Sequence, residues 1–225
     1  MGERVAAITG GHGALGRAVV EAAMAAGWAV AVIDHASGHA VPEGVLEVGG
    51  VDLTDPAQAK SAIDAVVARY GRLDALLNIA GGFVWTPVEG DGEEWDRMHA
   101  LNVKTTLNAS RAALTHLKAS PEGRIVNVGA NGAIKAGHGM GAYAASKAGV
   151  HRLTEALAEE LKSTSVTVNA VLPSIIDTAA NRADMPDADP ATWVAPADLA
   201  AVILFLASPE ARALTGALIP VTGKV

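Results

Sequence analysis

The glycine-rich turn Gly10–Gly16, with the sequence GGHGALG, constrains the fold of this chain more than any other feature. It follows a short apolar run, Val5–Thr9, and opens an amphipathic helical pattern. Glycines at a strand-to-helix turn let the backbone approach a pyrophosphate, and the start of the helix offers free N–H groups and a positive dipole end. We therefore predict a dinucleotide site whose turn residues are Gly10, Gly13, Ala14, Leu15 and Gly16.

Apolar runs alternate with longer helical patterns along the rest of the chain. Most of the runs are continuously apolar, which is typical of strands buried on both faces of a parallel sheet. The expected strands are Val5–Thr9, Ala29–Ile33, Val45–Val48, Ala75–Ile79, Arg124–Val128, Val166–Val171 and Leu218–Val221. The expected helices are Ala14–Ala26, Pro56–Tyr70, Glu93–Lys118, Ala142–Ser163 and Pro196–Ala207. This alternation predicts a single doubly wound α/β domain of the Rossmann type over residues 1–225.

Composition excludes several classes of function. The chain has 225 residues and a net charge of −7, so we expect no nucleic-acid partner. It has no cysteine, and its seven histidines are scattered along the chain, so we expect no disulfide and no metal. We also find no secretion signal and no apolar run long enough to span a bilayer, so we expect a cytoplasmic protein.

An acidic residue ends the second predicted strand. Asp34 stands eighteen residues after Gly16, where a carboxylate accepts hydrogen bonds from both ribose hydroxyls of NAD and repels the 2′-phosphate of NADP. The sequence therefore favours NAD(H). NADP(H) stays possible because His35 and Arg17 are nearby cations.

Two further strand ends fit a bound dinucleotide. Asp52 and Leu53 follow the third strand, where they would flank an adenine. The segment containing Asn78, Ala80 and Gly81 follows the fourth strand, where small residues let the backbone approach the adenosine ribose.

The chemistry of the chain is predicted from Tyr143 and Lys147, which lie four residues apart on one helix face. A free tyrosine has a pKa of about 10, and a nearby ammonium favours the phenolate. The pair could then exchange a proton with a substrate oxygen or nitrogen while hydride moves to or from a cofactor.

With these elements in order, the whole chain resembles the short-chain dehydrogenase/reductase family. The matching segments are Thr9–Gly16, Asp34, Asp52, Asn78–Gly81, Asn102, Tyr143–Lys147 and Pro173–Thr178. The resemblance implies a seven-stranded parallel sheet, NAD or NADP as hydride carrier, and a homodimer or homotetramer formed through the helices Glu93–Lys118 and Ala142–Ser163.

The resemblance also implies residue roles. Tyr143 would be the proton donor or acceptor, and Lys147 would bind the nicotinamide ribose and lower the tyrosine pKa. Asn102 would hold a water that links Lys147 to solvent. The nicotinamide would be flanked by Pro173, Ile176 and Thr178, although Ser174 replaces the glycine that usually follows this proline.

One member of the family's usual catalytic set is missing. The serine expected thirteen residues before Tyr143 is Ala130 here. Losing one such hydrogen-bond donor typically costs about 2.7–4 kcal/mol of transition-state stabilisation. Asn131 could offer an amide in its place, whereas Ser146 lies off the stripe of Tyr143 and Lys147.

The dihydropteridine reductase branch of the family resembles this chain more closely, through the GGHGALG turn, Ala130 and the segment Val171–Trp193. That branch uses NADH to reduce a quinonoid pterin, an activated imine-like compound that does not need the serine. The residues "NIAGG" (78–82) and Asn102 are closer to ordinary members of the family.

A small-molecule substrate is expected beneath the irregular segment 174–195, which is either a lid or a surface insertion. The predicted substrate residues are Trp85, Ala130, Asn131, Met140, Arg182 and Trp193. A pair of tryptophans would suit a flat heteroaromatic ring, although each could instead pack only its own loop. Arg182 would meet an anionic or carbonyl group, or simply face solvent.

Three functions stay open at this stage. The first is an NAD(P)H-dependent reductase of an activated C=N or C=O compound, including quinonoid dihydropteridine. The second is an alcohol dehydrogenase or ketoreductase in which Asn131 or a substrate group replaces the serine. The third is a dinucleotide-binding regulatory protein with little turnover, against which the intact Tyr143, Lys147 and Asn102 argue.

Overall fold

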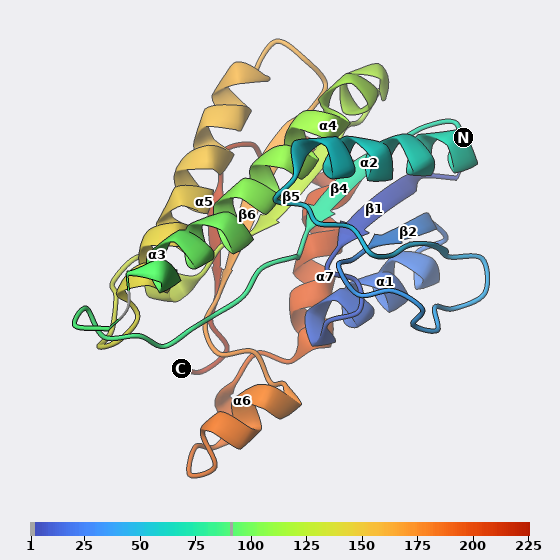
Figure 1. The fold of residues 1–225 in the computed structure, drawn as a ribbon. Helices are drawn as coiled ribbons and strands as arrows, with labels where there is room; N and C mark the ends of the chain where they lie inside the picture. The colour runs from blue at the N-terminus through green and yellow to red at the C-terminus, as the bar shows by residue number, and fades with distance from the viewer. Residues whose placement is uncertain (1–2, 91) are drawn as a thin grey trace.

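A single parallel sheet organises the chain in the computed structural model, which describes residues 3–90 and 92–225 (Figure 1). The sheet has seven strands in the order β3-β2-β1-β4-β5-β6-β7. The strands are β1 Val5–Thr9, β2 Ala29–Ile33, β3 Leu46–Val48, β4 Ala75–Asn78, β5 Arg124–Val128, β6 Thr167–Pro173 and β7 Leu218–Val221. Chain order reverses on either side of β1, and this switch point is where an open α/β sheet binds its ligand. The predicted doubly wound α/β fold is confirmed.

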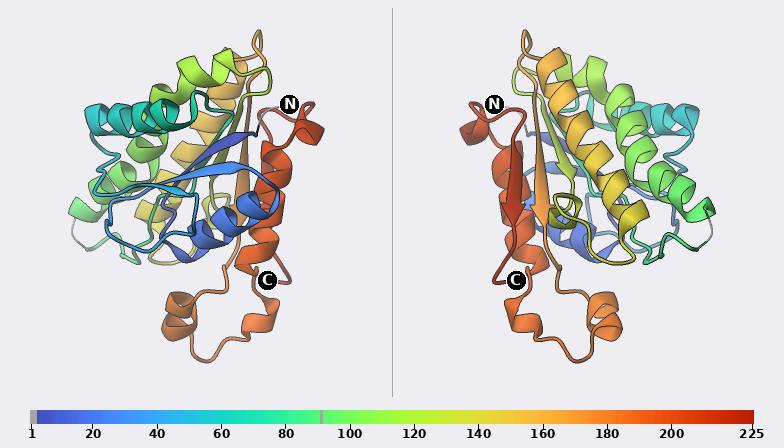
Figure 2. Two further views of the ribbon diagram at one scale, coloured as in Figure 1. Left: turned by 90° about the vertical axis from the view of Figure 1, so that its right-hand side faces the viewer. Right: turned by 90° about the vertical axis from the view of Figure 1, so that its left-hand side faces the viewer.

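Helices cover both faces of the sheet (Figures 1 and 2). On one face, α1 (Ala14–Ala25) packs beside α7 (Pro196–Ala207) over a buried apolar cluster. On the other face, a second cluster lies beneath α2 (Pro56–Tyr70), α4 (Thr105–Ala119) and α5 (Gly141–Glu160). Burial on both faces accounts for the continuously apolar strands.

Most of the predicted elements have their predicted bounds or differ by a few residues at one end. The largest difference is at the predicted helix Glu93–Lys118, which is divided by an irregular turn. It consists of α3 (Glu93–Met98), a π-helical turn over His99–Lys104, and α4. A π turn carries one extra residue per turn, so it changes which side chains face the protein interior. This turn carries Asn102, which is fully buried.

The segment 174–195 projects from the body of the molecule beyond the end of β6 (Figure 2). A parallel bridge between Ile176 and Val194 joins its two ends. It contains a short helix that the sequence did not predict, α6 (Ala179–Asp184), whose first turn is capped by the Thr178 hydroxyl accepting from the Asn181 N–H at 3.2 Å. The segment is therefore a closed loop on a narrow base.

The predicted domain, residues 1–225, includes residues 1, 2 and 91, which lie outside the described residues. Among the described helices, none combines the length and the apolar character needed to cross a bilayer.

Candidate active site

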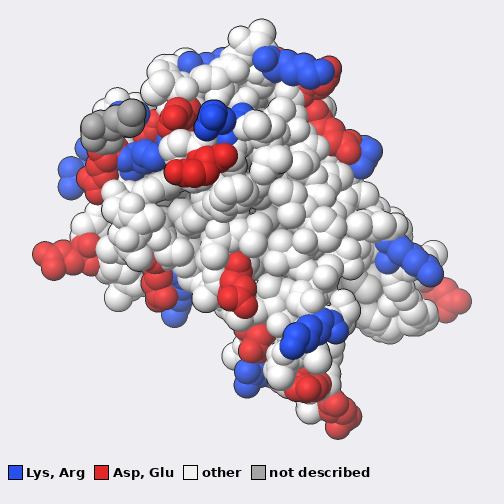
Figure 3. Space-filling model, turned by 180° about the vertical axis from the view of Figure 1, so that it is seen from behind, with Lys and Arg blue, Asp and Glu red and all other residues white. Residues whose placement is uncertain are grey.

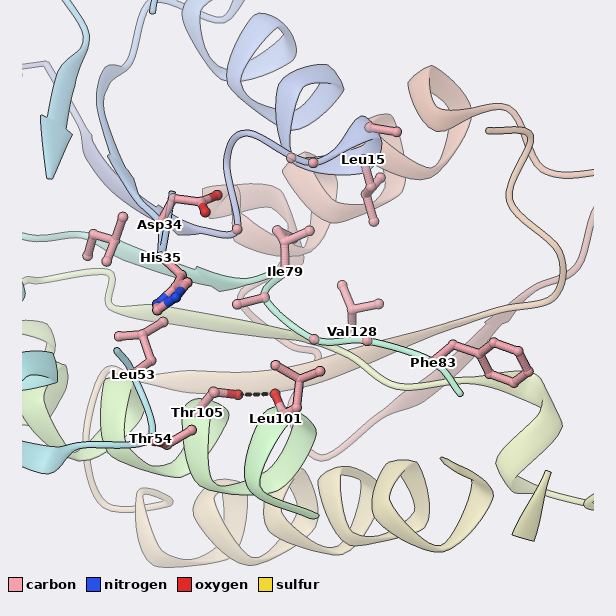
Figure 4. A pocket seen from close by; sticks show the side chains of 18 of the residues that line it. Leu15, Asp34, His35, Leu53, Thr54, Ile79, Phe83, Leu101, Thr105 and Val128 are labelled. Carbon is pink, nitrogen blue, oxygen red and sulfur yellow. Dashed lines mark hydrogen bonds between the residues drawn. The ribbon is translucent and has the colours of Figure 1, made fainter. Parts of the chain in front are cut away.

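A cavity of about 680 Å³ opens at the carboxyl ends of β1, β2 and β4. It brings together most of the residues predicted to bind a cofactor with the predicted proton donor. The predicted residues that line it are Gly10, Gly13, Ala14, Leu15, Gly16, Asp34, Asp52, Leu53, Ala80, Gly81, Tyr143, Lys147, Ile176 and Thr178. Figure 4 shows Asp34 and His35 at one end of the cavity and Phe83 at the other, with Ile79 and Val128 between them.

The glycine turn forms one wall of the cavity by close backbone packing. Gly10 has a φ of +69°, and a Cβ there would lie 2.8 Å from the backbone of Ala80. A Cβ at Gly16 would overlap the carbonyl oxygen of Gly10. The N-cap of α1 is Gly13, which offers no side-chain cap, so the first N–H groups of the helix are free to bind an anion. This cradle fits a pyrophosphate.

Asp34 lies at the far end of the cavity with its carboxylate held by the backbone. One oxygen accepts from the His12 N–H and the other from the Ala36 N–H, both at 3.0 Å. A carboxylate has about four lone-pair sites, so acceptor capacity for ribose hydroxyls remains. The position and charge of this group fit the predicted ribose role.

Asp52 and Leu53 line the cavity at the end of β3, as the adenine role requires. Asp52 accepts hydrogen bonds from the Thr54 hydroxyl at 2.7 Å and from the Thr54 N–H at 2.8 Å. These bonds lower the pKa of Asp52 below its usual value, so this carboxylate stays charged.

The prediction for Asn78 is corrected by the structure, since this residue does not line the cavity. Its amide is buried and donates to the Ser110 hydroxyl and to the side chain of Asn127. The backbone beyond it is held by Thr9, whose hydroxyl accepts from the N–H groups of Ile79 and Ala80 at 3.1 Å. Asn78 therefore fixes neighbouring elements, while Ala80 and Gly81 face the cavity.

Asn102 is committed to protein contacts rather than to the cavity wall. Its side-chain oxygen accepts from the Gly82 N–H at 2.9 Å, and its amide donates to the Gly82 carbonyl at 3.0 Å. The same amide donates to the Ser146 hydroxyl, which in turn donates to the Tyr143 carbonyl at 2.7 Å. Asn102 thereby joins the loop after β4 to α5, and its implied contact with a water stays a prediction.

Tyr143 and Lys147 reach the cavity from the first turns of α5. The Lys147 ammonium is buried and donates to the Val128 carbonyl at 2.8 Å. Burial lowers the pKa of Lys147 to about 8 and raises the pKa of Tyr143 to about 12. Desolvation is the cause of the raised pKa of Tyr143 in the chain without its cofactor, and the implied lowering of this pKa by Lys147 stays a prediction. The positive charge of an oxidised nicotinamide would act in the opposite direction.

Ala130 is buried, 3% exposed, at the end of β5, and its N–H donates to His151 Nε2 at 3.2 Å. Asn131 follows it and opens a short 3₁₀ turn, Asn131–Ala133. Neither residue lines the cofactor cavity. The hydroxyl that the family resemblance implies at this position is thus replaced by a methyl group in a closed backbone environment.

Five other predicted residues also lie outside the cavity, namely Pro173, Trp193, Arg182, Trp85 and Met140. Pro173 is buried as the last residue of β6, paired in register with Val221. Trp193 is buried, 7% exposed, at the base of the 174–195 segment, so the predicted tryptophan pair does not form the wall of this cavity. Arg182 forms an ion pair with Asp177, with atoms 2.6 Å apart.

Trp85 and Met140 lie in the loops outside the cavity. The Trp85 indole N–H donates to the His138 carbonyl at 3.0 Å, and its ring covers Gly139. The ring that does meet the site is Phe83, which contacts the Tyr143 ring edge-on with centroids 4.9 Å apart. Phe83 is 55% exposed and available to a substrate.

Several cavity residues were not predicted, because their only signal is a position at or after a strand end or on a helix. They are Ile33, Val51, Thr54, Leu101, Thr105 and Val128. Their side chains are mainly apolar, which suits the flat faces of a dinucleotide.

Comparison with known proteins identifies the family. Residues 4–189 match the family described as short chain dehydrogenase. The chain belongs to this family. It is 36% identical over 240 residues to a (5R,7aS)-5-hydroxy-7a-methyl-1-oxo-2,3,5,6,7,7a-hexahydro-1H-indene-carboxyl-CoA reductase of Mycobacterium tuberculosis, covering 97% of this chain and 92% of the relative. It is 32% identical to 2-(S)-hydroxypropyl-CoM dehydrogenase 3 of Xanthobacter autotrophicus, covering 97% of this chain and 95% of the relative.

Solved structures of this short-chain dehydrogenase family share the fold over nearly the whole chain. A 3-ketoacyl-(acyl-carrier-protein) reductase from Brucella melitensis, complexed with NADH, superposes with a TM-score of 0.87 at 26% identity and covers 99% of this chain and 98% of its own. An aldohexose dehydrogenase from Thermoplasma acidophilum gives a TM-score of 0.89 at 26% identity, covering 99% of this chain and 93% of its own. The protein is an oxidoreductase of this family, and its cofactor is a nicotinamide dinucleotide.

The glycine turn yields the first prediction. Gly16→Ala should weaken NADH binding and lower thermal stability, because the new methyl group meets the Gly10 carbonyl and the turn must shift. Overpacking of this kind typically costs about 1–3 kcal/mol. Gly92→Ala is a matched control, since a Cβ there meets nothing within 4 Å. Calorimetric titration with NADH and thermal melts give both readouts. Wild-type affinity for NADH in Gly16→Ala would contradict the prediction that the glycine turn binds the pyrophosphate.

Proposed function

We propose that this dehydrogenase is an NADH-dependent reductase that transfers hydride to an activated C=O or C=N group. The observation that carries the proposal is Ala130, a methyl group in place of the hydroxyl that would polarise an unactivated carbonyl. Without that donor, an ordinary ketone would lose about 2.7–4 kcal/mol of transition-state stabilisation. A substrate that is already electron-poor needs this polarisation least.

The chain's own residues supply the proton and the orientation, while the bound nicotinamide supplies the hydride. Tyr143 donates its phenolic proton to the oxygen or nitrogen that gains negative charge. A pKa raised to about 12 by burial keeps the phenol protonated at neutral pH, which suits a donor. Lys147, whose ammonium donates to the Val128 carbonyl, would bind the nicotinamide ribose. The products are the reduced substrate and the oxidised dinucleotide.

The substrate class follows from the groups around Tyr143. Phe83 offers an exposed ring beside the phenol, and flat substrates bind well against such a ring. Quinonoid dihydropteridine is the activated C=N compound that fits this description, and quinones and 1,2-diketones are the matching C=O compounds. The 174–195 segment would cover such a substrate as a lid, with Ile176 and Thr178 on the cofactor side.

The second prediction tests this proposal by NADH oxidation. Quinonoid dihydropterin or 9,10-phenanthrenequinone should give a kcat/KM at least about 10²-fold above that of cyclohexanone, reflecting the missing donor. Ala130→Ser should raise the activity on cyclohexanone and narrow this gap. Tyr143→Phe should abolish turnover while NADH binding, measured by titration, stays near the wild-type value. Equal rates on the two substrate classes would contradict the proposal.

A second candidate is an ordinary ketoreductase or alcohol dehydrogenase, favoured by the amide of Asn131. This side chain follows Ala130 directly and makes no hydrogen bond with any described residue. High activity on simple ketones, lost in Asn131→Leu, would establish this reading. NADH binding without turnover of any substrate would instead indicate a weakly catalytic regulatory protein.

The third prediction concerns the cofactor, for which we propose NAD(H) over NADP(H). Asp34→Ala should weaken NADH binding more than NADPH binding, because it removes both the ribose acceptor and the charge that repels a 2′-phosphate. Asp34→Asn is the matched variant, since it removes the charge but keeps one acceptor oxygen beside His12 and Ala36. Dissociation constants for both cofactors give the test. If the ratio of the NADH and NADPH dissociation constants is unchanged in both variants, the assignment of NAD(H) is wrong.

We also propose that the protein is a homodimer or homotetramer in the cytoplasm. Ala156 is exposed on the outer face of α5, and Phe205 on α7 is 49% exposed. Strand β7 ends the sheet with β6 on one side only. Figure 3 shows a broad area without Lys, Arg, Asp or Glu on the back of the molecule. An uncharged surface that includes exposed apolar side chains is consistent with a subunit interface.

The fourth prediction follows from these surfaces. Light scattering should give a mass of two or four times 22.8 kDa. Ala156→Arg or Phe205→Asp should lower this mass by disrupting a subunit interface. Ala156→Arg removes no core contact, so its melting profile serves as the folding control. A wild-type monomer at micromolar concentration would contradict the proposal.

A further inference from the structure

Two side chains of α5 bond to the backbone at the end of β5. Lys147 Nζ donates to the Val128 carbonyl at 2.8 Å, and His151 Nε2 accepts from the Ala130 N–H at 3.2 Å. Lys147 and His151 are four residues apart, so they lie on the same face of the helix, one turn from each other. Only Lys147 has a role in the proposed reaction, and the site described above does not use His151.

The surroundings of His151 are closed and leave little freedom to the ring. The residue is 4% exposed, and a Cβ at Gly129 would lie 2.5 Å from its Nε2. Leu172 of β6 contacts the same Gly129 position from the neighbouring strand. The imidazole of His151 therefore packs directly against the backbone of Gly129, the residue before Ala130.

We propose that His151 is a positioning residue, which holds the 129–133 segment against α5, the helix that carries Tyr143. The kinetic part of this inference rests on the proposed reductase function, whereas its structural part does not. The bond requires an unprotonated Nε2, so the ring proton must be on Nδ1. The donor that binds here is a backbone N–H, so this N–H is not available to a substrate oxygen.

Charge around the ring favours the form that the bond needs. Burial, followed by the positive charges of Arg152 and Lys147 on the same helix, lowers the pKa of His151 below its usual value. The residues that meet it from β5 and β6, Gly129, Ala130 and Leu172, carry no titratable side chain. At neutral pH the acceptor is intact. Protonation at lower pH places a proton on Nε2, and the bond to Ala130 is lost.

The structural test uses NMR of the full chain and needs no substrate. The ¹⁵N spectrum of His151 should show the Nδ1–H tautomer at pH 7.5, and the Ala130 amide should be protected from hydrogen exchange. Protection should fall in His151→Leu and return in His151→Gln, whose amide oxygen can accept the same bond. An Nε2–H tautomer, or an Ala130 amide equally protected in His151→Leu, would overturn the inference.

The kinetic test gives the fifth prediction, with 9,10-phenanthrenequinone as the substrate probe. His151→Leu should lower kcat about tenfold, the effect of one lost hydrogen bond, with the NADH dissociation constant unchanged. His151→Gln should recover most of kcat and should lack the decline in kcat that protonation of His151 causes in the wild type, at a pH below the usual titration range of a histidine. Equal loss in both variants would contradict a positioning role. If the wild type does not reduce the quinone, the proposed function fails and the NMR result still decides the inference.

Discussion

The buried amide of Asn102 is the interaction on which the rest of the active site depends. It bonds both backbone groups of Gly82 and also the Ser146 hydroxyl, so one side chain joins the end of β4 to α5. The β4 loop carries backbone that faces the dinucleotide, and α5 carries Tyr143, whose carbonyl accepts from Ser146. The loop after β4, on the cofactor side of the cavity, and α5, which carries Tyr143, are thus fixed relative to each other. A buried amide with satisfied partners is rigid, and leaving any partner unpaired is costly.

The fold was predictable from the sequence because its signals are local. Continuously apolar strands, a proline at the first residue of α2 and Gly71 at its end each reflect backbone chemistry within a few residues. The π turn around Asn102 was not predicted, because no local signal in the sequence marks it. The Asn102 amide within this turn bonds to Gly82 and Ser146, which are distant along the chain.

Site residues were predictable where the end of a strand or a tight turn fixes their position at the cavity. They were less predictable where the orientation of the side chain determines whether the residue reaches the cavity. The glycine turn and Asp34 line the cavity as predicted, since strand ends fix their positions. Asn78 and Trp193 do not line the cavity, because the Asn78 amide bonds to Asn127 and the Trp193 side chain is buried elsewhere. Nothing in a one-dimensional pattern distinguishes an asparagine that faces a ligand from one that bonds to Asn127 across two paired strands.

Ala130 and His151 meet in a wall at the end of β5, where the Ala130 N–H donates to the imidazole. A serine hydroxyl at that position would act through its side chain, whereas here the residue contributes a methyl group and a backbone N–H that is already bonded to the imidazole. Ala130 therefore offers a substrate only a van der Waals surface and no hydrogen bond. Under the proposed reductase function, such a wall discriminates little between charge states of the reacting oxygen, and Tyr143 is the group that responds to the charge that develops. Chemistry that depends on a single proton donor favours substrates that enter already activated.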